Sequence, residues 1–124
     1  MLNVMLVDDS ALLRDRIKKL LADIPKVQIV GEYETGLLAL EAIREKKPDV
    51  VVLDIHMPDG SGVVILKEIK NLYPTLKTVM FTNYSYPTYR NVCKRLGADN
   101  FFDKSTEYDD LIEYLGRLAK KKAS

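Results

Sequence analysis

The chain has 124 residues, of which 47% are hydrophobic and 30% are charged, and its formal net charge is +1. These values fit one ordinary globular domain, and the near balance of charge excludes a general attraction to nucleic acid or acidic membranes. A single cysteine excludes an internal disulfide and a multi-cysteine zinc site, and a single histidine argues against a zinc enzyme or a Ser-His-Asp hydrolase. Because no signal-peptide pattern and no bilayer-length apolar run is present, we expect a cytoplasmic location.

The first half of the chain alternates between short apolar runs and amphipathic segments. The apolar runs predict strands at residues 4–7, 27–30 and 50–53. Apolar residues recur at helical spacing from Ser10, a good N-cap residue, to Pro25, which ends a helix. A second helix is expected between Thr35 and Pro48.

The second half continues the alternation. Residues 56–62 are dense in turn-forming residues and are interpreted as a rigid turn. After it we expect a helix ending before Pro74, a strand at 78–82, a short helix from Pro87 to Gly97 and a strand at 100–102. A capping box at residues 106–109 begins the last helix, which is expected to fray into the lysine run 120–122.

Five strands that alternate with helices predict an α/β fold, a doubly wound parallel sheet with helices on both faces. Most of the predicted strands are followed by reactive polar residues: Asp8 and Asp9, Asp54, Thr82 and Lys104. Because the carboxyl ends of parallel strands meet at one edge, where ligands bind in such sheets, we expect these side chains to lie together.

The chemistry of this edge points to a metal ion and a phosphoryl group. Carboxylates that crowd together repel one another, and their hard oxygens suit Mg²⁺. Adjacent side chains diverge, so one of Asp8 and Asp9 is expected to bind the metal directly and the other through water. Asp54 is a candidate nucleophile, with Lys104 as a point cation and Thr82 as a hydroxyl donor.

At this point the whole chain resembles the receiver domain of two-component response regulators, with residues 1–124 as one such domain. The matching pieces are Leu6-Val7-Asp8-Asp9-Ser10, Val51-Val52-Leu53-Asp54-Ile55-His56-Met57-Pro58, Phe81-Thr82, Gly97-Ala98-Asp99 and Phe101-Phe102-Asp103-Lys104, with Gly60 and Gly62. Each piece is common by itself, but their order and spacing are specific. The resemblance implies a flavodoxin-like sheet with strand order 2-1-3-4-5.

The resemblance also implies a function in signalling. A histidine kinase or phosphotransfer protein would phosphorylate Asp54, and the domain would catalyse only its own phosphorylation and dephosphorylation. Output would be binding through the fourth helix, fifth strand and fifth helix, to a target protein or to a second copy of the chain. We expect no direct contact with nucleic acid or membrane.

Site residues follow from the resemblance position by position. Asp9, Asp54 and the backbone carbonyl of His56 are implied as Mg²⁺ ligands, and Asp8 as a ligand through water. Thr82 and Lys104 would hold phosphoryl oxygens. Phe101 occupies the position of the switch aromatic, three residues before the lysine.

Three features depart from the family pattern. Ser105 follows the lysine where many receivers have a proline after a cis bond, so the isomer of this bond is left open. Asn83 stands where receivers usually have a small residue, which argues against fast phosphorylation. We expect no DNA-binding or catalytic output domain after the last helix.

The residues around the acceptor suggest two further roles. His56 and Tyr84 are expected to overhang the phosphoryl site and to set how long the acyl phosphate survives. The cluster of Tyr84, Tyr86 and Tyr89 is interpreted either as packing around a short helix or as a partner surface.

Three alternatives are weighed beside the receiver. A haloacid-dehalogenase-type phosphatase also uses a strand-end aspartate and Mg²⁺, but it needs Asp-x-Asp, and here Asp8 and Asp9 are adjacent. A flavodoxin-like cofactor binder lacks support because no phosphate-binding loop follows the first strand. The third is a receiver fragment of a longer DNA-binding regulator.

Overall fold

The computed structural model describes residues 1–124 and contains a central parallel sheet of five strands. Its order is β2-β1-β3-β6-β7, which is 2-1-3-4-5 when only the strands of this sheet are numbered. The predicted fold class and strand order are therefore confirmed. The strands are β1 (Leu2–Val7), β2 (Val27–Tyr33), β3 (Val50–Leu53), β6 (Lys77–Thr82) and β7 (Asn100–Asp103).

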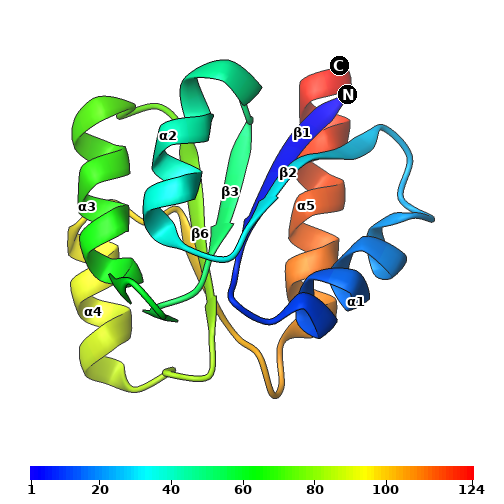
Figure 1. Ribbon diagram of the computed structural model, residues 1–124. Coiled ribbons are helices and arrows are strands. Elements are labelled where there is room, and N and C mark those ends of the chain that lie inside the picture. The colour runs from blue at the N-terminus through cyan, green and yellow to red at the C-terminus, as the bar shows by residue number, and fades with distance from the viewer.

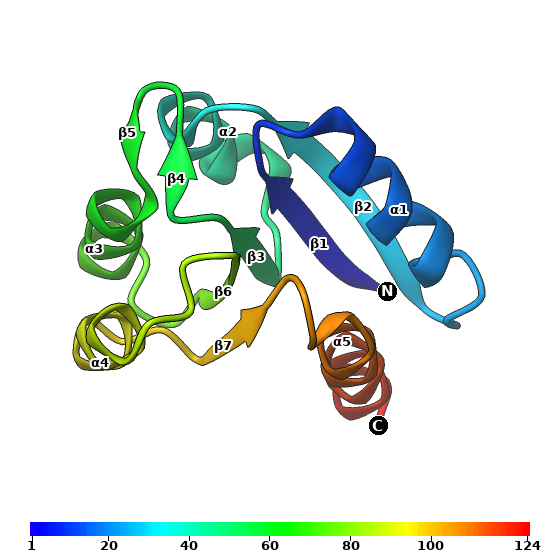
Figure 2. The same cartoon turned by 90° about the horizontal axis from the view of Figure 1, so that it is seen from below.

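Five helices cover the sheet, two on one face and three on the other (Figures 1 and 2). Helices α1 (Ala11–Leu21) and α5 (Tyr108–Ala123) lie on one face. Helices α2 (Gly36–Lys46), α3 (Gly62–Leu72) and α4 (Pro87–Arg95) lie on the other. This division is the result of βαβ crossovers that leave the sheet on either side.

Strand β3 is the centre of the molecule because it is buried on both faces. None of its four residues is exposed by more than 4%. Val51 and Leu53 point into the core beneath α2, α3 and α4, whereas Val50 and Val52 point into the core beneath α1 and α5. The continuous apolar run is therefore explained by a strand with no solvent-facing side.

A two-stranded hairpin was not expected at residues 56–62. Strands β4 (His56–Met57) and β5 (Gly60–Ser61) pair in antiparallel fashion directly after the carboxyl end of β3. Gly60 has a φ of 134°, a conformation that favours glycine. The turn composition was thus interpreted correctly, but strands of two residues leave no periodicity in a sequence.

The carboxy-terminal helix differs from its prediction at both ends. Its N-cap residue is Glu107, whose side chain makes no capping hydrogen bond, so the predicted capping box is wrong. The expected fraying at the lysines is also wrong, because α5 continues to Ala123. Lys122 Nζ lies 2.6 Å from Asp49 Oδ2, which holds the last turn against the start of β3.

Two further points complete the fold. All peptide bonds are trans, so the bond between Lys104 and Ser105, whose isomer was left open, is trans. No helix in the chain has both the length and the apolar character needed to cross a bilayer.

Candidate functional site

Two carboxylates stand at the carboxyl ends of neighbouring strands. Asp8 follows β1 and Asp54 follows β3, and these strands are paired up to Val7 and Leu53. Both side chains are buried, with Asp8 4% and Asp54 6% exposed, whereas Asp9 is exposed. One oxygen from each of the three carboxylates lies within 4.8 Å of the others. Figure 2 looks onto this edge of the sheet.

Lys104, 50 residues further along the chain, reaches into the same cluster. Its Nζ atom lies 2.7 Å from Asp8 Oδ2 and 2.8 Å from Asp54 Oδ2, and its side chain is only 10% exposed. The Lys104 backbone N–H donates to the carbonyl of Thr82 at 3.0 Å, which anchors the loop after β7 to the end of β6. The lysine therefore bridges the two buried carboxylates.

Burial and ion pairing have opposite effects on the pKa values of Asp8 and Lys104. Desolvation raises the pKa of Asp8 above its usual value even though Lys104 and the amide of Ser10 donate hydrogen bonds to it. For Lys104 burial would lower the pKa, but the hydrogen bonds to Asp54 and Asp8 outweigh it and raise the pKa. The lysine is therefore held as the ammonium ion, and it does not fully compensate the buried carboxylate of Asp8.

Backbone donors and one arginine fix the carboxylates in place. Asp8 Oδ1 accepts from the amide of Ser10 at 2.9 Å, and Asp54 Oδ1 accepts from the amide of Ile55 at 2.7 Å. Arg14 on α1 donates to the backbone carbonyl of Asp8. No sequence pattern indicates this role for Arg14, which is half-buried on its helix.

The donor set fits a divalent cation. Three carboxyl groups and one ammonium group lie within a few ångströms of one another, so the acidic groups outnumber the cation. All the side-chain donors are oxygens, which Mg²⁺ prefers, and one carboxylate is exposed so that bound water can complete the coordination. The raised pKa of Asp8 comes mainly from burial of the carboxyl group, and the nearby carboxylate of Asp54 adds a smaller contribution.

Thr82 and Asn83 lie at the end of the next strand, outside the carboxylate cluster. Thr82 is fully buried, and its hydroxyl oxygen accepts from the amide of Tyr84 at 3.1 Å. Asn83 is exposed. The pairing of Leu53 with Met80 brings this strand end beside Asp54, but the Thr82 hydroxyl is engaged with its own loop.

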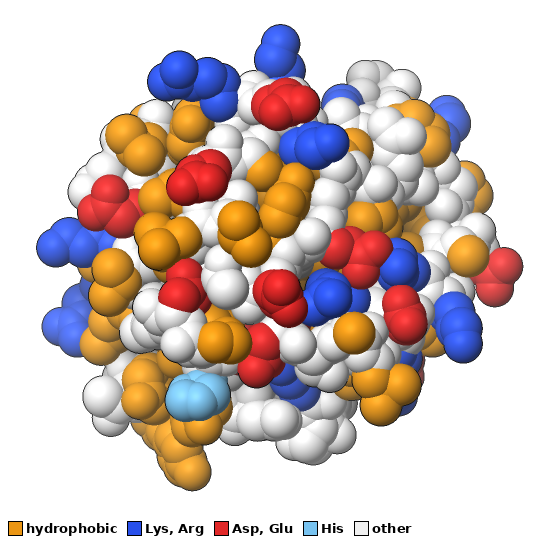
Figure 3. Space-filling model, viewed as in Figure 1, with side chains coloured by type: hydrophobic (Ala, Val, Ile, Leu, Met, Phe, Trp, Pro, Cys, Tyr) orange, Lys and Arg blue, Asp and Glu red, His pale blue; other side chains and the backbone are white.

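His56 and Tyr84 lie together, as the sequence analysis expects. Their ring centroids are 5.6 Å apart, and Tyr84 in turn meets Tyr89 edge-on at 6.1 Å. They line a pocket of about 250 Å³ beside the β4–β5 hairpin. In Figure 3 the histidine lies at the lower edge of the molecule among hydrophobic side chains.

Two residues that follow Asp54 in the chain make contacts that the sequence patterns do not indicate. A Cβ atom on Gly62 would lie 1.8 Å from the carbonyl oxygen of Asp54, so only glycine allows α3 to begin this close to Asp54. Asp59, in the hairpin turn, accepts from the amides of Gly36 and Leu37 at 3.2 and 3.0 Å and caps α2. Each contact joins separate elements of the fold, so local spacing does not reveal it.

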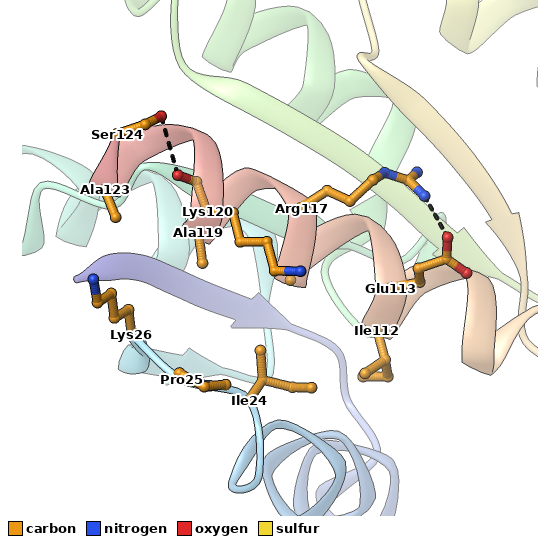
Figure 4. A pocket seen from close by; sticks show the side chains of 11 residues that line it. Ile24, Pro25, Lys26, Ile112, Glu113, Arg117, Ala119, Lys120, Ala123 and Ser124 are labelled. Atoms are coloured by element: carbon orange, nitrogen blue, oxygen red, sulfur yellow. Dashed lines mark hydrogen bonds and ion pairs between the residues drawn. The ribbon is translucent and has the colours of Figure 1, made fainter.

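The largest groove on the surface lies away from this cluster. It has a volume of about 740 Å³ and lies between the loop before β2 and the last turns of α5 (Figure 4). Its rim carries Lys26, Arg117 and Lys120, and Arg117 is paired with Glu113. The groove flanks the amino end of β2, because Lys26 directly precedes that strand, so it is separate from the carboxylates.

Comparisons with known proteins agree with the geometry. The profile of the response regulator receiver domain matches residues 4–116. The chain is 38% identical over 117 residues to a protein-glutamate methylesterase/protein-glutamine glutaminase of Carboxydothermus hydrogenoformans, covering 93% of this chain and 34% of that protein. It is 31% identical to the response regulator GacA of Pseudomonas aeruginosa, covering 95% of this chain and 55% of that protein. The chain thus spans between a third and just over half of the length of these relatives.

Solved structures show the same fold. The response regulator domain of Thermotoga maritima CheB superposes with a TM-score of 0.83 at 30% identity, covering 98% of this chain and 95% of that one. The REC domain of RcsB from Salmonella enterica serovar Typhimurium superposes with a TM-score of 0.88 at 27% identity, covering 96% and 88%. The chain therefore belongs to the response regulator receiver domain family.

Proposed function

We propose that this receiver domain, residues 1–124, gains and loses a phosphoryl group on Asp54 and thereby switches a protein-binding surface. The observation that carries the proposal is the buried pair of Asp8 and Asp54 with Lys104 between them and Asp9 beside them. The REC domain of RcsB, solved in the presence of the phosphomimetic BeF₃⁻, has the same fold and supports the proposal.

The proposed step forms one bond and breaks one. A carboxylate oxygen of Asp54 attacks the phosphorus atom of a phosphohistidine donor, and the P–N bond breaks with its electron pair left on the donor nitrogen. No general base is needed, because a carboxylate is already a nucleophile. Catalysis then consists of positioning and of neutralising charge on the phosphoryl oxygens, which is the role proposed for Lys104 and Thr82.

Asp9, Asp54 and the backbone carbonyl of His56 are the proposed ligands of Mg²⁺, with Asp8 acting through water. When bound, the ion supplies positive charge for the phosphoryl oxygens. Asp8 and Lys104 hold the acceptor carboxylate in place.

The switch is proposed to run through Phe101. A phosphoryl group adds about −1.5 to −2 charge, which would draw Thr82 and Lys104 toward Asp54. Phe101 would then change its rotamer, and α4, β7 and α5 would present a different face. The phosphoryl group shifts this equilibrium only by its different free energy of interaction with the two states.

The proposed partners are a histidine kinase or phosphotransfer protein as donor, and a target protein or a second copy of the chain as receiver of the signal. Neither nucleic acid nor membrane is a proposed direct partner, and the proposed location is the cytoplasm, where a buried free thiol such as Cys93 stays reduced. Beyond its own phosphorylation and dephosphorylation we propose no enzymatic activity. The adjacent pair Asp8 and Asp9 fits this function better than a dehalogenase-type phosphatase.

The test is incubation with acetyl phosphate and Mg²⁺, followed by intact mass measurement. The wild type should gain the mass of one phosphoryl group, which hydroxylamine removes. Chelation of Mg²⁺ and the substitution Asp54→Asn should each prevent the gain. If an equally labile group appears on the Asp54→Asn protein, the acceptor is wrongly assigned.

A further inference from the structure

Polar side chains join the loop after β6 to the loop after β7. The hydroxyl of Ser85, in the first loop, donates a hydrogen bond to Asp103 Oδ2. Arg90 on α4 donates through Nε to the carbonyl of Ser85 at 3.2 Å and pairs through Nη2 with Glu107 Oε1 at 3.0 Å. Ser85, Arg90, Asp103 and Glu107 are together called the loop latch here.

Glu107 and Asp103 are themselves bonded to each other. Glu107 Oε1 accepts from the amide of Asp103 at 2.9 Å, and the amide of Glu107 donates to the carbonyl of Asp103 at 2.8 Å. Asp103 also accepts from Ser105, and hydrogen bonds from the hydroxyls of Ser105 and Ser85 lower its pKa to about 2. The loop latch is thus a closed network in which each member has at least two partners.

Phe101 lies beneath Arg90. The guanidinium carbon is 4.7 Å from the centroid of the Phe101 ring, within the range of a cation–π contact. Arg90 Nη1 also makes a long hydrogen bond of 3.5 Å to the carbonyl of Phe101. The ring is half-buried and packs against the core beneath α4. A change of its rotamer therefore has to break the contact with Arg90.

The loop latch is attached in sequence to both residues that are proposed to move. Ser85 lies three residues after Thr82, and Asp103 directly precedes Lys104. Between the two loops the Lys104 amide already bonds to the Thr82 carbonyl. The hydroxyl of Thr82 is turned to the amide of Tyr84, in the same loop as Ser85. Movement of this hydroxyl to a phosphoryl group has to break its hydrogen bond to the loop that Ser85 ties down.

We propose that the loop latch holds Thr82, Lys104 and Phe101 in the arrangement of the unphosphorylated domain, and that Arg90 is the positioning residue which must release Phe101 when Asp54 is phosphorylated. This inference rests on the function proposed above. It assigns to Ser85, Arg90 and Glu107 a role that their place outside the carboxylate cluster does not suggest.

The loop latch is expected to be weak enough to open. Arg90 and Glu107 have side chains that are 38% and 30% exposed, and ion pairs this accessible to water contribute little. Loss of Arg90 should therefore change the population of the released state by about fivefold and leave the fold intact. A bistable loop of this kind suits a switch better than a rigid lock.

The experiment compares Arg90→Met and Ser85→Ala with the wild type and with Lys94→Met, a matched control. Lys94 is an exposed cation on the same helix and takes part in no ion pair or side-chain hydrogen bond. The rate of phosphorylation by acetyl phosphate with Mg²⁺ should rise about fivefold in Arg90→Met. It should rise in the same direction in Ser85→Ala and stay at the wild-type value in Lys94→Met.

A second measurement does not depend on phosphorylation. In protein with labelled phenylalanine rings, Arg90→Met should shift and broaden the Phe101 ring resonances, whereas Lys94→Met should leave them unchanged. If the wild type is phosphorylated but Arg90→Met matches Lys94→Met in rate and in spectrum, the loop latch is refuted. If no protein gains a phosphoryl group, the proposed function fails. An unmoved Phe101 ring in Arg90→Met would then refute the loop latch separately.

Discussion

The Nζ atom of Lys104 lies 2.8 Å from Oδ2 of Asp54, and the same ammonium group lies 2.7 Å from Asp8. The lysine thus serves as the cation for two buried carboxylates in the unphosphorylated domain. A phosphoryl group on Asp54 would give it a new and more negative partner. The Lys104 ammonium group therefore pairs with carboxylate oxygens in the unphosphorylated domain, and with phosphoryl oxygens in the proposed phosphorylated state.

Removal of this cation should destabilise the domain. The substitution Lys104→Met leaves Asp8 and Asp54 buried without their partner, which should lower the free energy of unfolding by about 3 kcal/mol in EDTA. Mg²⁺ should restore part of the loss, because it can neutralise the same carboxylates. Urea unfolding with and without Mg²⁺ measures both effects.

Lys122→Met is the control for that experiment. Its pair with Asp49 is partly exposed, with side chains 44% and 31% accessible, so its loss should change stability by less than about 1 kcal/mol. Equal losses in the two variants, or no effect of Mg²⁺ on Lys104→Met, would contradict the account of the carboxylate cluster.

Gly62 should tolerate no side chain. A Cβ atom there would lie 1.8 Å from the Asp54 carbonyl oxygen, so Gly62→Ala has to displace the backbone of the acceptor or the start of α3. We expect a loss of about 2–3 kcal/mol in urea unfolding and slower phosphorylation.

Gly116→Ala is the same chemical change as Gly62→Ala, but we expect it to have the opposite effect on stability. A Cβ atom there would meet only Ile24 Cγ2, at an ordinary 3.6 Å, and the residue lies inside α5. Since alanine favours helix over glycine, stability should rise by about 0.5–1 kcal/mol. A loss of stability would show that the groove beside α5 is more tightly packed than these distances imply.

Asp103 should give the domain an acid-sensitive contribution to stability. Its pKa is held at about 2, below the 3.8 of an unperturbed aspartate. Because this pKa is lowered in the folded state, the ionised carboxylate stabilises the fold above pH 3.8. This stabilisation is lost as the pH falls toward 2. Asp8, whose pKa is raised by burial, acts with the opposite sign.

The measurement is an NMR titration of the side-chain carboxyl of Asp103, with acid unfolding of Asp103→Asn beside it. The carboxyl should titrate near pH 2 in the wild type and closer to 3.8 in Ser85→Ala. The asparagine variant should lose less stability than the wild type between these two pH values. A wild-type titration near 3.8 would mean that the serine hydrogen bonds do not persist in solution.

Much of the sheet could be predicted because the strands are marked twice, by an apolar run and by the polar residue that ends it. β3 and Asp54 are the clearest case. The carboxylates and Lys104 could be brought to one edge by topology alone. Contacts that depend on three-dimensional approach could not be predicted, such as the cap that Asp59 places on α2.

Glu107 illustrates why local patterns fail. Residues 106–109 resemble a capping box, but α5 begins after Glu107, whose carboxylate bonds to the amide of Asp103 and to Arg90. Arg90 lies 17 residues away on another helix, so local spacing does not indicate this partner of Glu107. The same holds for Lys122, which remains helical because Asp49 binds it.

His56 and Tyr84 are expected to set the lifetime of the phosphorylated state. Their rings are 5.6 Å apart, and His56 follows Asp54 by two residues, so we expect the rings to limit the approach of water. His56→Ala and Tyr84→Ala should each accelerate dephosphorylation several-fold after removal of the phosphodonor. Unchanged rates in both variants would remove this role from the pair.

The most direct test of the account locates the phosphoryl group itself. After reaction with acetyl phosphate and Mg²⁺, borohydride reduces an acyl phosphate to the corresponding alcohol, and peptide mass spectrometry then identifies the modified residue. We expect the alcohol at Asp54 alone, with Asp8 and Asp9 unmodified. A modified Asp8 or Asp9, or the absence of any reduced residue in protein that binds Mg²⁺, would contradict it.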